Sequence, residues 1–183
     1  MKILSWNVQG AKKIQVIQEV KFLIRTQKAD MLFLLETMVN ESNIKKILPL
    51  MGFHHYDYVS PVNHSGGITV LWNNDNIHAS VVMKESRAIH MLIHDPIKVQ
   101  NSIISGVYAP AQSREKNEFW HHLIELNKVL DLLLCLIGDF NEILCPNEKF
   151  GGQPPGTNRF HKLRDFLCTV NVECVPTSSR LFT

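Results

Sequence analysis

The chain has 183 residues, of which 45% are hydrophobic and 20% charged, so it has ordinary globular composition and enough length for one sizeable core. Its longest apolar runs, residues 31–35 and 132–137, fall far short of the roughly 18 residues that a membrane-spanning helix needs. A formal net charge of +2 permits a nucleic-acid partner without indicating one. We therefore expect a monomer with one domain over residues 1–183, no secretory signal and no membrane association.

No CxxC pair occurs among the four cysteines, which are Cys135, Cys145, Cys168 and Cys174. Their wide spacing argues against both a zinc site and a disulfide framework. We therefore expect a reducing compartment, which means the nucleus or the cytoplasm.

Short apolar runs alternate with amphipathic stretches, which is the pattern of strands and helices in a mixed α/β domain. Five runs predict strands buried on both faces, at residues 2–7, 31–36, 67–72, 103–108 and 133–138. Between residues 77 and 94, Ile89, Met91 and Ile93 alternate with polar residues, which predicts antiparallel strands with one more exposed face.

Apolar residues at helical spacing predict three helices. The first contains Ile14 to Ile24, and the second extends from a cap at Ser113 through a stripe that ends at Leu133. The third contains Phe160 to Val170, after a cap at Thr157 or Asn158. The order of these elements indicates the α/β class.

Four of the predicted strands end in, or run directly into, residues that could act on a ligand. Asn7 ends the first strand, Glu36 the second and Tyr108 the fourth, while Asp139 and Asn141 follow the last. Each residue taken alone is an ordinary strand-end or turn residue. Because loops at one end of neighbouring strands converge in layered α/β folds, the set predicts a site.

In this order the residues resemble the motifs of the endonuclease/exonuclease/phosphatase superfamily, which includes apurinic endonucleases and DNase I. The motifs are Ser5-Trp6-Asn7-Val8-Gln9-Gly10, Leu35-Glu36-Thr37, Ser65-Gly66-Gly67, Val107-Tyr108-Ala109-Pro110 and Gly138-Asp139-Phe140-Asn141-Glu142. Residues 148–152 and 180–183 are similar to endonuclease domains of plant non-LTR retrotransposons. The resemblance implies a DNase I-like fold, a two-sheet sandwich flanked by helices in four layers.

The resemblance also implies a role for each residue. Glu36 would be the carboxylate ligand of Mg²⁺ or Mn²⁺, with Asn7 beside it holding a metal-bound water or a phosphate oxygen. Asp139 would orient and deprotonate the attacking water, and Asn141 would support it and contact the phosphate. Tyr108 would donate a hydrogen bond to a nonbridging phosphate oxygen.

Three further residues are candidates for contact with a nucleic-acid strand. Arg114 and Lys116 follow the Tyr108 motif on the second predicted helix, and His64 precedes the Ser65-Gly66-Gly67 motif. A solvated helix face and a surface loop are the alternative interpretations.

The function implied is magnesium-dependent phosphodiester hydrolysis by a retrotransposon DNA endonuclease, made within a longer polyprotein with reverse transcriptase. In this superfamily a Ser-Asp-His motif completes the site, and the 183 residues lack it. We therefore expect the last strands of the sandwich to be missing and nuclease activity to be weak or absent. Two alternatives stay open, a catalytically silent nucleic-acid-binding fragment and a phosphatase or phosphodiesterase acting on small phosphorylated molecules.

Overall fold

The computed structural model describes residues 1–62, 66–74, 78–95, 100–130, 132–145, 148 and 161–175. Two units can be distinguished, one formed by Met1–Tyr108 with Leu132–Asp139 and the other by Ala109–Asp131 with Phe140–Thr183. The chain therefore passes from one unit to the other after residues 108, 131 and 139. That residues 1–183 form a single domain stays a prediction.

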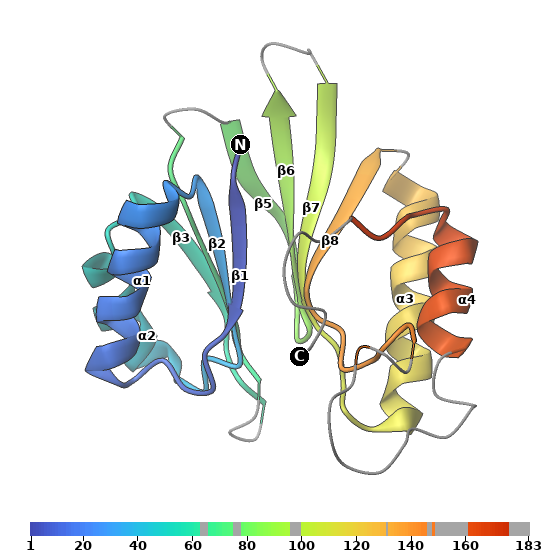
Figure 1. Cartoon of the computed structure of the whole chain (residues 1–183), viewed down its shortest axis with the longest axis horizontal. Helices are drawn as coiled ribbons and strands as arrows, with labels where there is room; N and C mark the ends of the chain where they lie inside the picture. Colours follow the sequence, from blue (N-terminus) through green and yellow to red (C-terminus); the bar gives the residue numbers. More distant parts are fainter. Residues whose placement is uncertain are drawn as a thin grey trace. The chain divides into compact units, whose positions relative to one another are not determined.

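The first sheet of the first unit has the strand order β1-β2-β4-β3 (Figure 1). Its strands are β1 (Ile3–Asn7), β2 (Met31–Leu35), β3 (His55–Val59) and β4 (Ile68–Trp72). β1 runs parallel to β2, whereas β4 runs antiparallel to both of its neighbours. β2 and β4 occupy the centre of the sheet and are buried along their whole length.

The second sheet of this unit has the order β5-β6-β7-β8. Its strands are β5 (His78–Glu85), β6 (Ala88–Asp95), β7 (Gln100–Tyr108) and β8 (Leu133–Asp139). The first three strands are antiparallel in turn, and β8 runs parallel to β7. Each sheet therefore contains one parallel pair, β1–β2 in the first and β7–β8 in the second.

An apolar core lies between the two sheets. Met31 and Phe33 of β2 belong to the same buried cluster as Met91 of β6 and Ile104 of β7. A Cβ atom at Gly106 of β7 would lie 2.0 Å from Cδ1 of Phe33. Glycine at this position therefore lets the Phe33 ring pack directly against the backbone of the other sheet.

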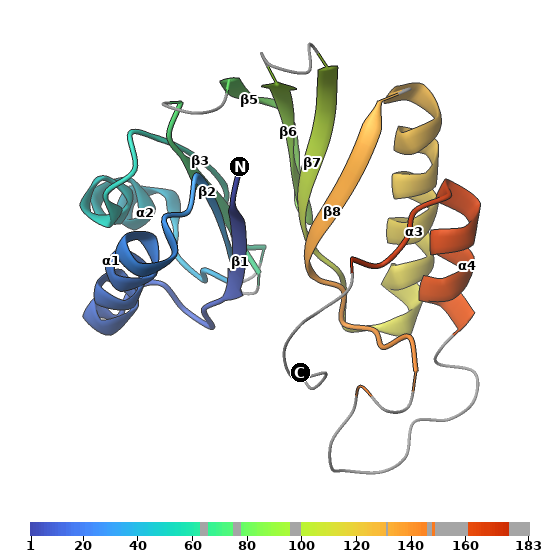
Figure 2. The same ribbon diagram turned by 45° about the horizontal axis from the view of Figure 1, so that its top comes forward.

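Helices cover the outer face of the first sheet. α1 (Ile14–Gln27), α2 (Glu41–Ile47) and the 3₁₀ helix η1 (Leu48–Met51) contribute to a second buried cluster with Leu32 and Leu34 of β2. Figures 1 and 2 both show α1 and α2 on the same side of this sheet. The alternating directions of the β2 side chains thus serve one core on each face.

The second unit contains α3 (Ser113–Leu130) and α4 (His161–Val170), which lie side by side in Figures 1 and 2. Their contact is aromatic, because the ring centroids of Trp120 and Phe166 are 4.8 Å apart. No helix in the described parts of either unit is long and apolar enough to cross a membrane.

The predicted α/β class and two-sheet sandwich with flanking helices are confirmed. Burial of every strand on both faces is wrong for β1 and β8, which are half-buried edge strands. The predicted apolar stripe of the second helix is too long, because α3 ends at Leu130 and Leu133 begins β8. Thr157 and Asn158, the predicted cap residues, lie outside the described residues.

Candidate active site

Polar side chains gather where the two parallel strand pairs end. In the first sheet Asn7 ends β1 and Glu36 follows β2, while Tyr108 and Asp139 are register partners at the ends of β7 and β8. Two hydrogen bonds join the sheets here. Asn7 Nδ2 donates to Asp139 Oδ2 at 2.9 Å, and the Tyr108 hydroxyl donates to Glu36 Oε1 at 3.1 Å. We call these four residues the cross-sheet cluster.

The backbone at Glu36 has an unusual conformation that neighbouring loops hold in place. Its φ is +57°, in the left-handed region that residues other than glycine rarely adopt. The Gly10 amide donates to the Glu36 carbonyl at 2.9 Å, and the Thr37 amide donates to the Gly67 carbonyl at 3.2 Å. Such strain persists where the surroundings over-determine it, and it is concentrated at functional sites.

At two positions of the sequence motifs, steric contacts leave no room for a side chain and require glycine. A Cβ atom at Gly67 would lie 2.6 Å from Oγ1 of the buried Thr37, which directly follows Glu36. Gly138 has a φ of +146°, and its Cβ atom would lie 2.0 Å from the Val107 carbonyl oxygen. Glycine is therefore needed directly before Asp139, so that β8 can stay paired with β7 up to its last residue.

The phenol of Tyr108 is held in its protonated form. Burial raises its pKa above the ordinary value, and the Glu36 carboxylate raises it further through its charge and its hydrogen bond, with Asp139 adding a smaller effect. The guanidinium of Arg87 acts in the opposite direction. At neutral pH the Tyr108 hydroxyl is consequently a hydrogen-bond donor.

Arg87 is a candidate site residue that the sequence analysis missed. It lies in the turn between β5 and β6, where its carbonyl accepts a hydrogen bond from the Tyr108 amide at 3.0 Å. Its Cζ atom lies 5.6 Å from the centroid of the Tyr108 ring, a cation–π distance. An arginine in a short turn has no distinguishing sequence signal, because its position depends on how β6 pairs with β7.

Asn141 belongs to the second unit, two residues along the chain from Asp139. Its φ is +47°, and its side-chain amide donates to the Ala109 carbonyl at 2.7 Å. The ammonium of the buried Lys116 donates to the Asn141 carbonyl at 2.5 Å and to Glu142 Oε1 at 2.7 Å. These four residues form a polar network within this unit.

The structure thus brings four of the predicted site residues together in the first unit and places Asn141 and Lys116 in a network of the second. Arg114 is exposed in the first turn of α3. His64, and residues 149–152 and 180–183 of the retrotransposon-like motifs, lie outside the described residues. Substrate contact by Arg114, Lys116 and His64 stays a prediction.

The cross-sheet cluster has donors that suit a hard divalent cation. Mg²⁺ prefers oxygen ligands and takes only one or two carboxylates from a protein. The Glu36 carboxylate and Asn7 Oδ1 are such donors, and although Asn7 Oδ1 accepts from the Gln9 amide at 3.2 Å, a carbonyl oxygen has a second lone pair. Across the described ranges, no three His, Cys, Asp or Glu side chains converge as a metal-binding group. The donor chemistry fits Mg²⁺ or Mn²⁺.

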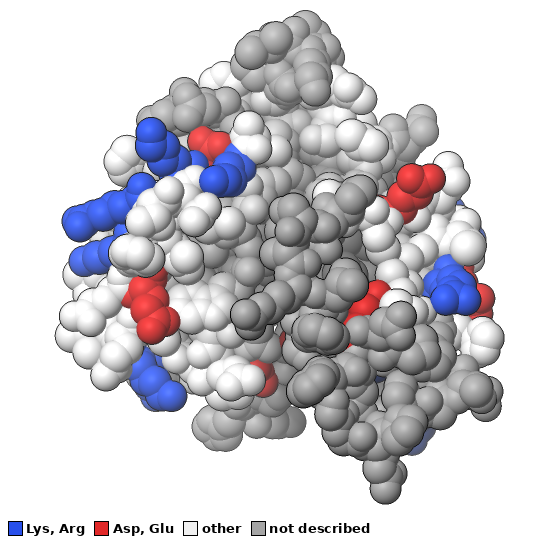
Figure 3. Space-filling view, in the orientation of Figure 1, with Lys and Arg blue, Asp and Glu red and all other residues white. Residues whose placement is uncertain are grey.

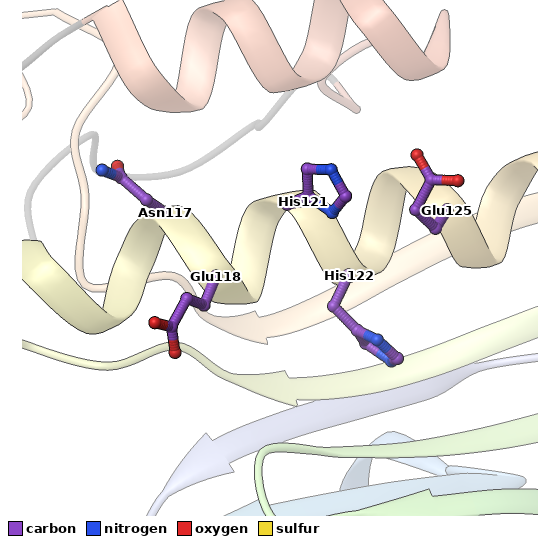
Figure 4. Close-up of a pocket in the computed structure, with 5 residues that line it drawn as sticks. All are labelled: Asn117, Glu118, His121, His122 and Glu125. Carbon is purple, nitrogen blue, oxygen red and sulfur yellow. The ribbon is translucent and has the colours of Figure 1, made fainter.

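A shallow hollow on α3 does not form a second site of this kind. Its lining residues all come from that helix and are Asn117, Glu118, His121, His122 and Glu125. In Figure 4 Glu118 and His122 point to one side of the helix, whereas Asn117, His121 and Glu125 point to the other. The five side chains therefore do not converge on one ligand.

The sequence matches the Endonuclease/Exonuclease/phosphatase family over residues 4–172. The chain belongs to this family, whose fold is the DNase I-like two-sheet sandwich. No curated protein matches the sequence.

Three solved structures illustrate the likeness in fold. The AP endonuclease of Leishmania major has a TM-score of 0.68 at 16% identity, over 91% of this chain and 66% of that one. The endonuclease domain of TRAS1, a telomere-specific non-LTR retrotransposon, has 0.65 at 12% identity, over 92% and 71%. A 3′ phosphatase from Neisseria bound to a product DNA hairpin has 0.67 at 17% identity, over 92% and 71%. The chain thus spans just under two thirds of the Leishmania enzyme.

Proposed function

We propose that this chain is a phosphodiesterase domain that nicks DNA with the help of Mg²⁺ or Mn²⁺. The two hydrogen bonds of the cross-sheet cluster carry this proposal, because they bring two carboxylates, an amide and a protonated phenol to one end of the sandwich. Phosphodiester hydrolysis needs a metal ligand, a base for the attacking water and donors for the charge on the phosphate, and these groups can supply all of them.

Each residue of the cluster has a proposed task. Glu36, with the side-chain oxygen of Asn7, would hold the divalent ion, which when bound would neutralise charge on the phosphate. Asp139 would accept the proton of the attacking water, while the Asn7 amide fixes the orientation of its carboxylate. Tyr108 would donate to a nonbridging phosphate oxygen as negative charge develops there. Asn141 would contact the same phosphate.

DNA is the proposed substrate, and Arg87 is the proposed contact to the strand beside the reacting phosphate. Figure 3 shows Lys and Arg side chains gathered over α1 and α2 in that view. The basic residues of and around α1 are exposed, and they are Lys12, Lys13, Lys21, Arg25 and Lys28. We assign this surface to solvent, because it lies on the polar face of an amphipathic helix.

The biological setting is also a proposal. Likeness to the TRAS1 domain supports a retrotransposon endonuclease, and the resemblance in sequence supports a plant element. Such a domain would act as a monomer within a polyprotein that includes reverse transcriptase, in the nucleus or cytoplasm. The reported action of another relative on a 3′ phosphate supports the alternative of phosphomonoester hydrolysis.

Nicking of supercoiled plasmid in Mg²⁺ tests the proposal. We expect Glu36→Gln and Asp139→Asn each to lower the rate on the order of a hundredfold or more. Asp57→Asn, which removes a β3 carboxylate paired with Lys84, is the matched control and should retain the rate. Chelation of the metal should abolish nicking.

The comparison should include a chain extended with the C-terminal segment of a related domain, because we expect residues 1–183 alone to nick weakly. An abasic duplex, a 3′-phosphorylated hairpin and inositol phosphates distinguish the alternatives. Hydrolysis of inositol phosphates alone would indicate a small-molecule phosphatase. Salt-sensitive DNA binding without cleavage by either chain would indicate a silent binding fragment.

A further inference from the structure

The loop that follows β8 is held by side chains of one helix. We propose that Lys116 is a positioning residue which, together with Trp120, fixes residues 140–142 and thereby places Asn141 for the reaction. The inference rests on the proposed function, since it assumes that Asn141 contacts the phosphate.

Lys116 and Trp120 lie four residues apart on α3 and therefore point from the same face of the helix. The Trp120 ring stacks on Phe140 with a centroid distance of 6.2 Å and an interplanar angle of 16°. One turn earlier, Lys116 Nζ donates to the Asn141 carbonyl at 2.5 Å and to Glu142 Oε1 at 2.7 Å. Three consecutive loop residues are thus held by two side chains of α3.

The burial of Lys116 suits a positioning role better than contact with a DNA strand. Its side chain is 8% exposed and that of Glu142 is 7% exposed. A lysine that neutralises phosphates must bring its ammonium to the surface, whereas this ammonium is withdrawn between a carboxylate and a carbonyl. The position of Lys116 in the first turn of α3 is therefore explained by the loop that it holds.

Lys116 contacts the loop at Asn141, a residue with a left-handed backbone conformation. Asn141 has a φ of +47°, and its carbonyl is the group that Lys116 binds. Its side-chain amide is anchored separately, by the Ala109 carbonyl at 2.7 Å. Because a left-handed conformation persists only when its surroundings impose it, loss of the lysine contact should release the backbone at Asn141.

The variants must avoid leaving a buried charge alone, because Lys116→Ala would strand the Glu142 carboxylate and risk unfolding. The double variant K116M/E142Q removes both charges and the bond to Asn141. The single variant E142Q is the matched control, because Lys116 keeps its bond to the Asn141 carbonyl and the glutamine amide oxygen can still accept from the ammonium. K116R keeps a cation at the same place.

Hydrogen exchange of the amides of residues 139–145 tests the positioning role without any need for activity. We expect exchange of these loop amides in K116M/E142Q to be about tenfold faster than in E142Q, with protection of the α3 amides unchanged. Equal exchange in the two variants would overturn the proposal.

Nicking kinetics then test what this positioning does. We expect K116M/E142Q to lose about tenfold to a hundredfold in kcat relative to E142Q with little change in KM, and K116R to retain most of the wild-type kcat. In an Asn141→Ala background the same double change should add almost nothing. A rise in KM with unchanged kcat and a smaller salt dependence would show that Lys116 binds DNA, which overturns the proposal. A wild-type chain that does not nick, even when extended, would refute the proposed function, while hydrogen exchange would still decide the role of Lys116.

Discussion

Tyr108 shows how one residue combines several demands. It ends a buried strand, is 8% exposed, donates to Glu36 and lies under the guanidinium of Arg87. Its hydroxyl is therefore positioned on one side by a carboxylate and its ring on the other by a cation. The raised pKa of Tyr108 follows from this environment, and it has a measurable effect on stability.

Tyr108→Phe should flatten the alkaline pH dependence of stability. Because the folded protein holds the pKa of Tyr108 above its ordinary value of about 10, the unfolded chain releases this proton at lower pH than the folded protein. The contribution of Tyr108 is thus complete below about pH 10 and is lost as pH rises through the folded pKa. Urea unfolding at about pH 8 and about pH 10.5 should show a larger loss for wild type than for Tyr108→Phe. Parallel losses would contradict this account.

Gly138→Ala should destabilise the first unit by about 3 kcal/mol or more, because the new Cβ atom meets the Val107 carbonyl oxygen and φ is positive. Gly52→Ala is the matched control, since Gly52 has a φ of +86° but open space around it. The control should lose only about 1–2 kcal/mol. Chemical denaturation measures both, and equal losses would argue against a steric role for Gly138.

At the scale of elements, the site depends on one parallel strand pair in each sheet. Parallel strands bring their carboxyl ends to the same edge, so β1 and β2 present Asn7 and Glu36 together, and β7 and β8 present Tyr108 and Asp139. The packing of Phe33 against Gly106 then fixes the distance between the sheets. Core packing is therefore part of how the site is built.

Gly106→Ala should destabilise the protein by about 1–3 kcal/mol, because its Cβ atom would overlap the Phe33 ring. Phe33→Leu leaves space for the added methyl group, so Gly106→Ala should lower the free energy of unfolding by less in that background. Urea unfolding of the four proteins of this double-mutant cycle gives the coupling energy. Strict additivity would mean that the two positions do not share this contact.

Periodicity predicted most elements but not their partners. The buried runs of β2 and β4 and the apolar faces of α1 and α4 are strong local signals. β3 was not predicted, because its sequence, His-Tyr-Asp-Tyr-Val, alternates weakly and its burial comes from pairing with β4. The exposure of β1 and β8 likewise depends on their place at the sheet edges, which a strand's own sequence does not specify.

At the scale of the whole molecule, the net charge is low, so the positions of individual cations matter more than their sum. A net charge of +2 gives little general attraction to DNA, so individual cations near the cross-sheet cluster should dominate binding. Arg87 is the described cation that contacts this cluster through Tyr108. Binding should consequently be sensitive to this residue and insensitive to basic residues on α1.

Arg87→Ala should weaken DNA binding and lower the slope of log K against log salt by about 1, as expected for the loss of one phosphate contact. Arg25→Ala removes an exposed cation from the last turn of α1 and should change neither quantity. Fluorescence anisotropy with a labelled duplex at several salt concentrations measures both variants. Equal effects would place the DNA on a different surface.

The order of the motifs predicted that the site residues lie together, whereas the structure shows which of them are hydrogen-bonded to one another. Asn7, Glu36, Tyr108 and Asp139 were predicted from motif order, and the structure places all four in one cluster. The resemblance suggested Asn7 beside Glu36, whereas the side-chain amide of Asn7 donates to Asp139 on the other sheet. Such pairing depends on the stacking of two sheets, for which one sequence contains no direct signal.

The two hydrogen bonds of the cross-sheet cluster also have a mechanical consequence. Each joins a residue of one sheet to a residue of the other, so a shear displacement between the sheets stretches both bonds at once. The rate of nicking should therefore fall as the two sheets are displaced from each other. A substitution at Phe33, deep between the sheets and outside the cross-sheet cluster, should lower nicking in proportion to the shear it permits, even where the protein stays fully folded.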